Sequence, residues 1–313
     1  MTGFGVPRDA YGEILSELGE TRKDIVVLDA DLSSSTKTSS FGKKFPDRFF
    51  NVGIAEQNMI GIAAGLSTTG KTVFASSFAM FAVGRVYDQI RQSIAYSKMN
   101  VKIVATHAGI TVGEDGVSHQ MIEDISLMCA LPNMKVIVPA DTFETKKTIR
   151  EVSQEKGPTY VRLGRSKVPN VFNSEDEIKM GKASTLVDGG DITLISSGIM
   201  VSKSLEAAQM LKKDGISAEV INLSTLKPID RQGIIKSAKK TGCIVTAEEH
   251  NIYIGMGALV SSILCEEYPV PILRCGIKDT FAQSGDYELL MQIYNLTSDE
   301  ICKLSKNVIA MKR

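Results

Sequence analysis

The sequence is poor in the residues that mark disulfide-bonded and metal-binding proteins. Its 313 residues include no tryptophan, only three histidines and five cysteines. The cysteines are odd in number, scattered along the chain and form no Cys-x-x-Cys pair, which argues against a disulfide framework and against a structural zinc site. A reduced, cytoplasmic setting is therefore expected.

Long hydrophobic runs and an excess of one charge are also missing. No apolar run approaches the roughly 20 residues of a membrane span, and the first residues do not have the basic-then-apolar order of a signal peptide. Lysine and arginine together number 36, as do aspartate and glutamate. With no net charge, no electrostatic field draws the chain to nucleic acid or to an anionic membrane, and we expect neither as a partner.

What the sequence does contain is a regular alternation of predicted strands and helices. Short runs of branched apolar residues alternate with stretches in which apolar residues recur at helical spacing. This alternation predicts an α/β fold with parallel sheets covered on both faces. In the first half the predicted elements are helix 8–20, strand 25–29, a polar loop 32–44, strand 72–74, helix 78–97, strand 101–105, helix 119–129, strand 135–138 and a helix capped by Asp141.

The periodicity fades between residues 167 and 190, where prolines, asparagines and a pair of glycines occur. We place a linker there, between a first domain of residues 1–166 and a smaller α/β domain of residues 191–313. In the second domain the predicted elements are strand 192–196, helix 201–213, strand 218–221, helix 230–239, strand 243–247, helix 255–266, a strand near 271–273 and helices near Tyr287 and Asp299.

The stretch from Asn51 to Met59 predicts a strand that turns directly into a helix. Gly53 permits the tight exit from the strand, and Glu56 falls in the first turn of the helix. In open α/β sheets, ligands bind outside the carboxyl ends of the strands, which is where this turn places Glu56. A carboxylate in a first helical turn also favours the helix dipole without any ligand, so the pattern alone leaves both interpretations open.

Two further segments follow predicted strands. Asp31 begins a hydroxyl-rich turn that includes Ser35, although such a turn needs no ligand. Phe78 and Phe81 are three residues apart, which puts both rings on one face of the predicted helix. Paired aromatic rings usually pack in a core, but they also hold flat heterocycles by stacking.

A third segment holds two of the three histidines, His107 and His119, at the ends of a loop punctuated by glycines. Glycine lets a loop approach a ligand closely, and the same loop carries Asp115. Histidine passes protons near neutral pH, so the loop is a candidate site for a hydroxyl-rich substrate. A metal site and a surface loop without a ligand remain alternatives. Arg162 and Arg165 follow, and a guanidinium fork is suited to phosphate.

These motifs together resemble the transketolase family, specifically its pyrimidine-binding and C-terminal domains. The resemblance covers nearly the whole chain. Its most specific motifs are Gly-Ile-Ala-Glu56-Gln-Asn, the run from His107 through Gly-Glu-Asp115-Gly to His119-Gln120, and Pro139-Ala-Asp141. The fold it implies is a thiamine-diphosphate-binding, pyrimidine-type doubly wound parallel sheet domain, followed by a smaller α/β domain of the transketolase C-terminal type.

The resemblance also implies roles for individual residues. Glu56 would hydrogen-bond the aminopyrimidine of thiamine diphosphate and promote the tautomer that deprotonates the thiazolium carbon. Phe78 and Phe81 would pack on the pyrimidine ring, and Asp31 would line the cofactor pocket. The implied residues that contact the sugar during catalysis are His107, Asp115 and His119. The implied residues that bind a substrate phosphate are Arg8, Ser35 and Arg165.

The sequence departs from a full transketolase in one respect. It has no Gly-Asp-Gly motif followed at a distance by asparagine, through which the family binds diphosphate and Mg²⁺. The resemblance therefore implies the C-terminal subunit of a two-chain transketolase, which transfers a two-carbon ketol unit between a ketose phosphate and an aldose phosphate. The implied partner is an N-terminal transketolase subunit in an α2β2 heterotetramer. Thiamine diphosphate and Mg²⁺ would be held mainly with that partner, and no metal site is expected in this chain.

Other functions remain open. A deoxyxylulose-phosphate-synthase-like enzyme has a similar glutamate motif, but normally in one long chain. The beta subunit of a 2-oxo-acid dehydrogenase is a natural half-chain, but the Gly-Glu-Asp-Gly-x-x-His-Gln loop favours polyol phosphates. A non-catalytic homologue would be expected to have lost Glu56 or His119, and both are present. His250 follows Glu248 and Glu249 in the second domain, and we interpret it as structural.

Overall fold

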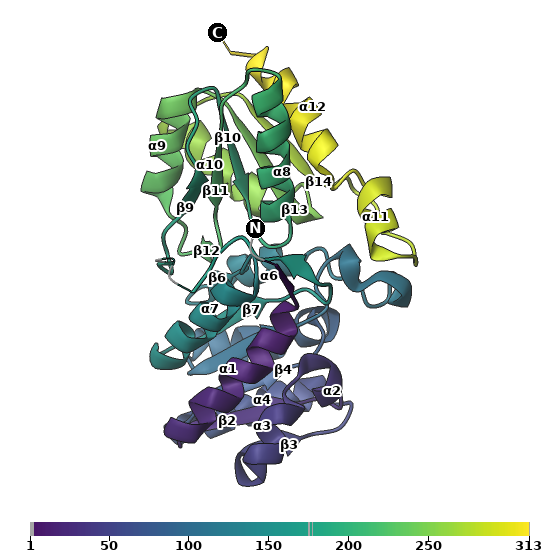
Figure 1. Cartoon of the computed structure of the whole chain (residues 1–313). Coiled ribbons are helices and arrows are strands. Elements are labelled where there is room, and N and C mark those ends of the chain that lie inside the picture. The colour runs from purple at the N-terminus through teal and green to yellow at the C-terminus, as the bar shows by residue number, and fades with distance from the viewer. Residues whose placement is uncertain (1–2, 175, 177, 313) are drawn as a thin grey trace.

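The first half of the chain folds around a seven-stranded sheet (Figure 1). The computed structural model describes residues 3–174, 176 and 178–312. In spatial order the strands are β12 (Thr225–Lys227), β6 (Lys135–Ile137), β7 (Thr159–Arg162), β5 (Val101–Ala105), β4 (Thr72–Ser76), β2 (Ile25–Asp29) and β3 (Phe49–Asn51). Neighbouring strands run parallel except at one edge, where β12 pairs antiparallel with β6. Because β12 comes from the second half of the chain, this sheet joins the two halves.

Helices cover both faces of this sheet, so β2, β4 and β5 are buried along their whole length. Apolar residues of α1, α3 and α7 pack on one face, and those of α4, η3 and α6 pack on the other. The helices are α1 (Pro7–Thr21), α2 (Ser33–Thr36), α3 (Ser39–Lys44), η1 (Pro46–Arg48), α4 (Glu56–Thr68), η2 (Met80–Gly84), α5 (Tyr87–Gln89), η3 (Ile90–Tyr96), η4 (Ile110–Asp115), α6 (Asp124–Ala130) and α7 (Thr142–Gln154).

The second half forms a five-stranded sheet above the first in the view of Figure 1. Its strands, in spatial order, are β14 (Ile272–Ile277), β13 (Ile244–Asn251), β10 (Ile192–Ser196), β11 (Ala218–Asn222) and β9 (Ser184–Val187), of which β9 alone runs antiparallel to its neighbour. Its helices are α8 (Met200–Lys213), α9 (Arg231–Thr241), α10 (Met256–Glu267), α11 (Tyr287–Ile293) and α12 (Ser298–Ile309). A separate strand pair, β1 (Phe4–Gly5) with β8 (Val168–Pro169), completes the fold.

The predicted α/β fold class is confirmed, and strands 25–29, 101–105 and 192–196 have the predicted bounds. The cap of α7 is also as predicted, because the Asp141 side chain accepts a hydrogen bond from the Glu144 N–H. Other local predictions are wrong. The polar loop predicted at 32–44 contains α2 and α3, and the helix predicted to begin at His119 begins only at Asp124.

The helix predicted at 78–97 is not a regular α-helix. It contains the π-helical turns η2 and η3 on either side of the short α5. A π-turn holds one extra residue, which breaks the 3.6-residue spacing of the side chains, and such turns are common at functional sites. Because η2 lies between Phe78 and Arg85, it sets the relative direction of these two side chains.

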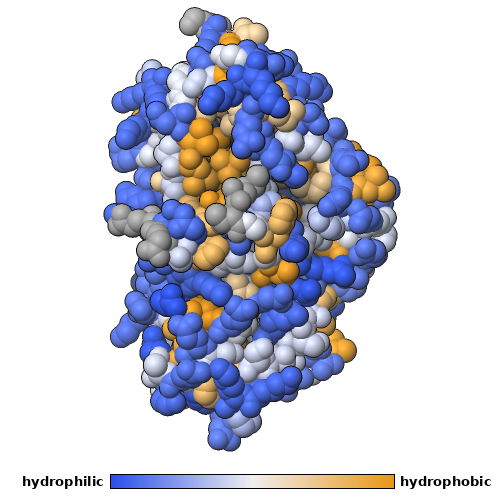
Figure 2. All heavy atoms as spheres, in the orientation of Figure 1, coloured by the Kyte–Doolittle hydropathy of each residue, from blue (hydrophilic) through white to orange (hydrophobic). Residues whose placement is uncertain are grey.

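The segment predicted as a linker, 167–190, includes β8 and β9. The domain boundaries at residues 166 and 191 stay predictions. Figure 2 shows hydrophilic residues over most of the viewed face, with smaller hydrophobic areas between them. Within the described ranges, no helix has both the length and the apolar composition that crossing a membrane requires.

A buried polar cluster lies where the two halves meet. One carboxylate oxygen of Asp124 accepts hydrogen bonds from the Tyr160 hydroxyl at 2.6 Å and from Nε of Arg162 at 2.8 Å. His250 of β13 is fully buried, and its Nε2 lies 3.9 Å from the other oxygen of Asp124. Burial lowers the pKa of His250 to about 4, because the loss of hydration outweighs the attraction of Asp124. His250 is therefore neutral in the folded protein at neutral pH.

The low pKa of His250 predicts a pH-dependent contribution to stability. As the pH falls below 6.5, the unfolded chain binds a proton at this residue before the folded chain does. The contribution is therefore present above about pH 6.5 and is lost as the pH falls toward about 4. The unfolding free energy of the wild type minus that of His250→Gln should fall by roughly 1–3 kcal/mol between about pH 7 and about pH 4.5. Urea unfolding at both pH values measures it, and a constant difference would contradict the burial effect.

Candidate active site

The site forms where β2, β4 and β5 end. These strands pair in parallel, so their carboxyl ends lie at one edge of the sheet. Asp31, Phe78 and His107 follow the three strands directly and emerge together at that edge. Asp31 and His107 have backbone φ angles of 65° and 59°, which residues other than glycine rarely adopt and which often mark functional positions.

Aromatic rings cluster at this edge. Phe78 stacks on His107, with ring centroids 3.7 Å apart and planes 25° apart. Phe81 lies nearly parallel to Phe78, with centroids 6.1 Å apart, and His119 meets Phe81 edge-on at 5.2 Å. The structure therefore brings together the two histidines and the two phenylalanines that the sequence singled out.

Arg8, at the start of α1, reaches this ring cluster. Its Nη1 donates to the backbone oxygen of Ser35 at 3.1 Å and lies 3.3 Å from Nε2 of His107. Its Nε is buried and has no hydrogen-bond acceptor among the atoms of the described residues. Leaving such a donor unpaired is costly, so this N–H is suited to bind an anionic ligand. Ser35 contacts Arg8 through its carbonyl oxygen.

His107 is held as a neutral ring of defined tautomer. Because a guanidinium can only donate, Nε2 accepts the hydrogen bond from Arg8. Nδ1 then carries the ring hydrogen and donates it to the hydroxyl of Thr106 at 2.8 Å. Burial and, to a smaller extent, the nearby charges of Arg8, Arg165, His119 and Lys37 together lower the pKa of His107 to about 3. His107 therefore lies among several cations.

Glu56 is the first residue of α4, and only 2% of it is exposed. Its Oε2 accepts a hydrogen bond from Nη1 of Arg85 at 2.8 Å. The guanidinium carbon of Arg85 lies 4.4 Å from the ring centroid of Phe81. One flat, hydrogen-donating group is thus stacked on Phe81 and bonded to Glu56 at the same time.

The contacts of Arg85 with Glu56 and Phe81 bear on whether the chain can hold a pyrimidine ring. An aminopyrimidine is also flat and donates hydrogen bonds, and the guanidinium shows that Glu56 and Phe81 are spaced to hold such a group between them. The residues present therefore fit the pyrimidine part of thiamine diphosphate. Among the described residues, no group of three or more His, Cys, Asp or Glu side chains is arranged to hold a metal ion.

The other predicted site residues lie at the rim. Asp31 is exposed, and its carboxylate accepts a hydrogen bond from the Asn51 amide at 3.3 Å. Arg165 forms an ion pair with Glu114 at 3.1 Å, so its guanidinium is already engaged. Asp115 is exposed, and in the part of the chain that the structure describes no hydrogen bond joins it to the other predicted residues. The catalytic, cofactor and phosphate roles stay predictions.

Sequence reasoning missed three neighbours of the site: Lys37, Thr106 and Arg85. Lys37 ends α2 with a φ of 70° and forms an ion pair with Asp9 at 3.2 Å. Arg85 follows Phe81 by four residues, a spacing at which helical side chains meet, and this was the available signal. Thr106 had no signal beyond its place next to His107.

Known proteins are similar to this chain in sequence and in fold. Residues 7–171 match the pyrimidine-binding domain of transketolase, and residues 181–301 match the transketolase C-terminal domain. A putative transketolase C-terminal section from Methanocaldococcus jannaschii is 52% identical over 299 residues, which cover 95% of this chain and 94% of the relative. A 6-deoxy-6-sulfo-D-fructose transketolase subunit from Clostridium sp. (strain MSTE9) is 40% identical, with 97% of this chain and 95% of the relative covered.

A solved structure described as a split gene transketolase, inactive beta4 tetramer, is 50% identical and superposes with a TM-score of 0.92, covering 98% of this chain and 99% of the other. Fold and site thus define an α/β protein with a pyrimidine-binding domain followed by a C-terminal domain. The chain belongs to the transketolase family, and it corresponds to the C-terminal section of that family. The expected family and fold are confirmed.

The surroundings of His107 predict its titration. With a pKa of about 3, its ring should not titrate between about pH 5 and pH 8. Arg8→Met removes a neighbouring cation and should raise the pKa of His107. The pKa should still lie below the ordinary value of histidine, because burial is the largest cause of its shift. Because the chain has three histidines, ring carbon–proton NMR spectra resolve each one. Arg91→Met, on the exposed side of η3, is the matched control. Titration of wild-type His107 near its ordinary pKa would contradict the assignment.

Proposed function

We propose that this chain is the C-terminal subunit of a two-chain transketolase that uses thiamine diphosphate. The reaction breaks the carbon–carbon bond that joins the carbonyl carbon of a ketose phosphate to the rest of the sugar. The two-carbon ketol unit is transferred to the aldehyde carbon of an aldose phosphate. The observation that carries the proposal is the Glu56–Arg85–Phe81 arrangement, in which a flat donor occupies the contacts that a pyrimidine ring needs. Membership of the family supports the same conclusion.

Thiamine diphosphate, when bound, supplies a carbon nucleophile and an electron sink for breaking the carbon–carbon bond. In the proposed mechanism Glu56 holds a proton at the pyrimidine nitrogen and exchanges it with that ring. Burial of Glu56 keeps water from competing for this contact. Phe78 and Phe81 pack on the ring, and Asp31 lines the pocket near the end of β2.

The substrate end of the site carries positive charge. Arg8 offers an unpaired N–H, and Lys37 and Arg165 lie near enough to His107 to affect its pKa. We propose that Arg8, Ser35 and Arg165 bind the phosphate of the sugar, with Lys37 as an additional cation. Nε2 of the neutral His107 can accept a hydrogen bond from a sugar hydroxyl in place of the one from Arg8, alongside contacts from His119 and Asp115. A sulfonate suits the same cations, and one relative is described as acting on a sulfo-sugar.

A partner subunit is the second part of the proposal. The sequence has no Gly-Asp-Gly motif for diphosphate and Mg²⁺. The 50% identical structure is described as a split gene transketolase whose beta4 tetramer is inactive. We propose that an N-terminal transketolase subunit supplies the diphosphate and Mg²⁺ site in an α2β2 heterotetramer, and that this chain alone has no activity.

The test mixes the chain with an N-terminal subunit that carries the Gly-Asp-Gly motif, thiamine diphosphate and Mg²⁺, and measures ketol transfer from a ketopentose phosphate. Glu56→Ala should lower kcat by at least about a hundredfold, because general acid–base catalysis contributes about that much. Subunit assembly, measured by light scattering, should not change. Glu13→Ala, an exposed glutamate of α1, is the control. Full activity of Glu56→Ala, or tight cofactor binding by the chain without a partner, would refute the proposal.

Arg85 must leave its contacts before a pyrimidine ring can use them, because it bonds Glu56 and covers Phe81. Arg85→Gln should therefore raise the affinity of the assembled complex for thiamine diphosphate by about tenfold, which corresponds to losing one competing charged hydrogen bond. Calorimetric titration with Mg²⁺ present measures this affinity. Arg91→Gln, which is exposed on η3, is the matched control. An affinity that falls in Arg85→Gln would mean that Arg85 assists the cofactor instead of competing with it.

A further inference from the structure

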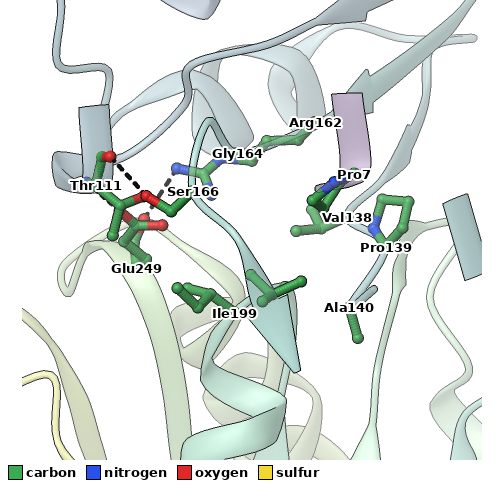
Figure 3. Close-up of a pocket in the computed structure, with 12 residues that line it drawn as sticks. Pro7, Thr111, Val138, Pro139, Ala140, Arg162, Gly164, Ser166, Ile199 and Glu249 are labelled. Atoms are coloured by element: carbon green, nitrogen blue, oxygen red, sulfur yellow. Dashed lines mark hydrogen bonds between the residues drawn. The ribbon is translucent and has the colours of Figure 1, made fainter. Parts of the chain in front are cut away.

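The histidine loop, residues 107–121, is anchored at its base by the second half of the chain. Oε1 of Glu249, on β13, accepts a hydrogen bond from the Thr111 N–H at 2.7 Å, and the two residues face each other in Figure 3. A Cβ added at Gly109 would lie 2.1 Å from that carboxylate, and Gly109 has a φ of +82°. The loop can therefore approach Glu249 this closely only with glycine at position 109.

Arg162 connects this anchor to the other end of the histidine loop. Its Nη2 donates to the backbone oxygen of Glu249 at 2.9 Å, and its Nε donates to Asp124 at 2.8 Å. Asp124 begins α6, just after the loop. The Gly109 N–H donates to the Met121 oxygen at 2.8 Å, which closes the loop. Both stems of the loop are thus bonded to one buried cluster.

The middle of the histidine loop, at Glu114, and its second stem, at Gln120, are held by a different part of the second half. The Ser284 hydroxyl donates to the backbone oxygen of Glu114. The side-chain amide of Gln120, next to His119, donates to the backbone oxygen of Gln283 at 3.1 Å. These residues precede α11, which Figure 1 shows projecting from the second half toward the first. The loop is therefore fixed at two separate places.

We propose that the second half of the chain positions the histidine loop for the reaction, with Glu249 and Ser284 as positioning residues. Both act through the loop on His119, which they keep beside Phe81. The inference rests on the proposed function and gives the C-terminal domain a part in turnover beyond assembly. A glycine-rich loop has many conformations, and these anchors help to select one of them, together with the bonds from Arg165 to the Val112 oxygen and from Ser166 to the Thr111 oxygen within the first half. Displacing a substrate-contacting group by about 1 Å can cost a hundredfold in rate.

Hydrogen–deuterium exchange of the full chain tests the anchors without requiring activity. Glu249→Ala removes the acceptor of the Thr111 N–H, so exchange at the loop base should accelerate by about tenfold or more. Glu249→Gln keeps an acceptor oxygen and should restore slow exchange. Ser284→Ala should accelerate exchange around Glu114. If Glu249→Ala does not fold, the result for Ser284→Ala decides whether the anchors hold the loop. Glu206→Ala, on α8, is the control. Unchanged loop exchange in the variants that fold would overturn the proposal.

Kinetics of the assembled complex test the positioning role. Glu249→Ala and Ser284→Ala should lower kcat by about tenfold or more, while the KM for thiamine diphosphate stays within about twofold, because the loop lies on the substrate side. Glu249→Gln should recover most of the kcat. Faster loop exchange with an unchanged kcat would overturn the positioning role. A wild-type complex without ketol transfer would refute the proposed function and the positioning role with it, and the exchange result alone would then decide whether the anchors exist.

Discussion

The parallel register of β2, β4 and β5 is the constraint on which the site depends. Asp29 lies opposite Ser76, and Ala75 lies opposite Ile103, so the three strands end at nearly the same level. A bridge between Phe78 and Thr106 continues this pairing into the site. The ring of Phe78 can meet that of His107 only because the chain leaves both strands at one edge. Residues far apart in the sequence thereby become neighbours at the edge where α/β sheets bind their ligands.

The charges around this edge favour an anionic ligand. Burial lowers the pKa of Arg8, which shows that its charge is poorly hydrated, and Arg165 lowers it further. Lys37 and Arg165 are partly compensated by Asp9 and Glu114 at the rim, whereas the Nε of Arg8 is not compensated within the described part of the chain. A phosphate or sulfonate would accept a hydrogen bond from the Nε of Arg8, and its negative charge would compensate for the water that Arg8 has lost. Because His107 is neutral, it adds no further positive charge next to the hydroxyl groups of a sugar.

How much the sequence could predict depended on the range of each interaction. The bounds of β2 and β5 follow from continuous apolar runs, and the cap of α7 follows from two residues that are three apart. The π-turn before Arg85 leaves no mark on the apolar pattern, so the four-residue spacing indicates the contact of Arg85 with Phe81 but not its hydrogen bond to Glu56. The hydrogen bond from Thr111 to Glu249 joins residues 138 positions apart, and no local pattern encodes it. The candidate residues were therefore found, but not the side chains that hold them.

If Glu56 binds the pyrimidine as proposed, the Glu56–Arg85 pair explains how this carboxylate can stay buried before the ligand arrives. Glu56 is almost completely buried, and a buried carboxylate without a partner would destabilise the fold. Arg85 is nearly half exposed, with 44% of its side chain accessible, so it can leave this pair for water at little cost to itself. A flat ligand that stacks on Phe81 and bonds Glu56 replaces both contacts that Arg85 gives up. Replacing Arg85 by the ligand therefore costs the chain little free energy, because Glu56 has a hydrogen-bond partner both before and after the ligand binds.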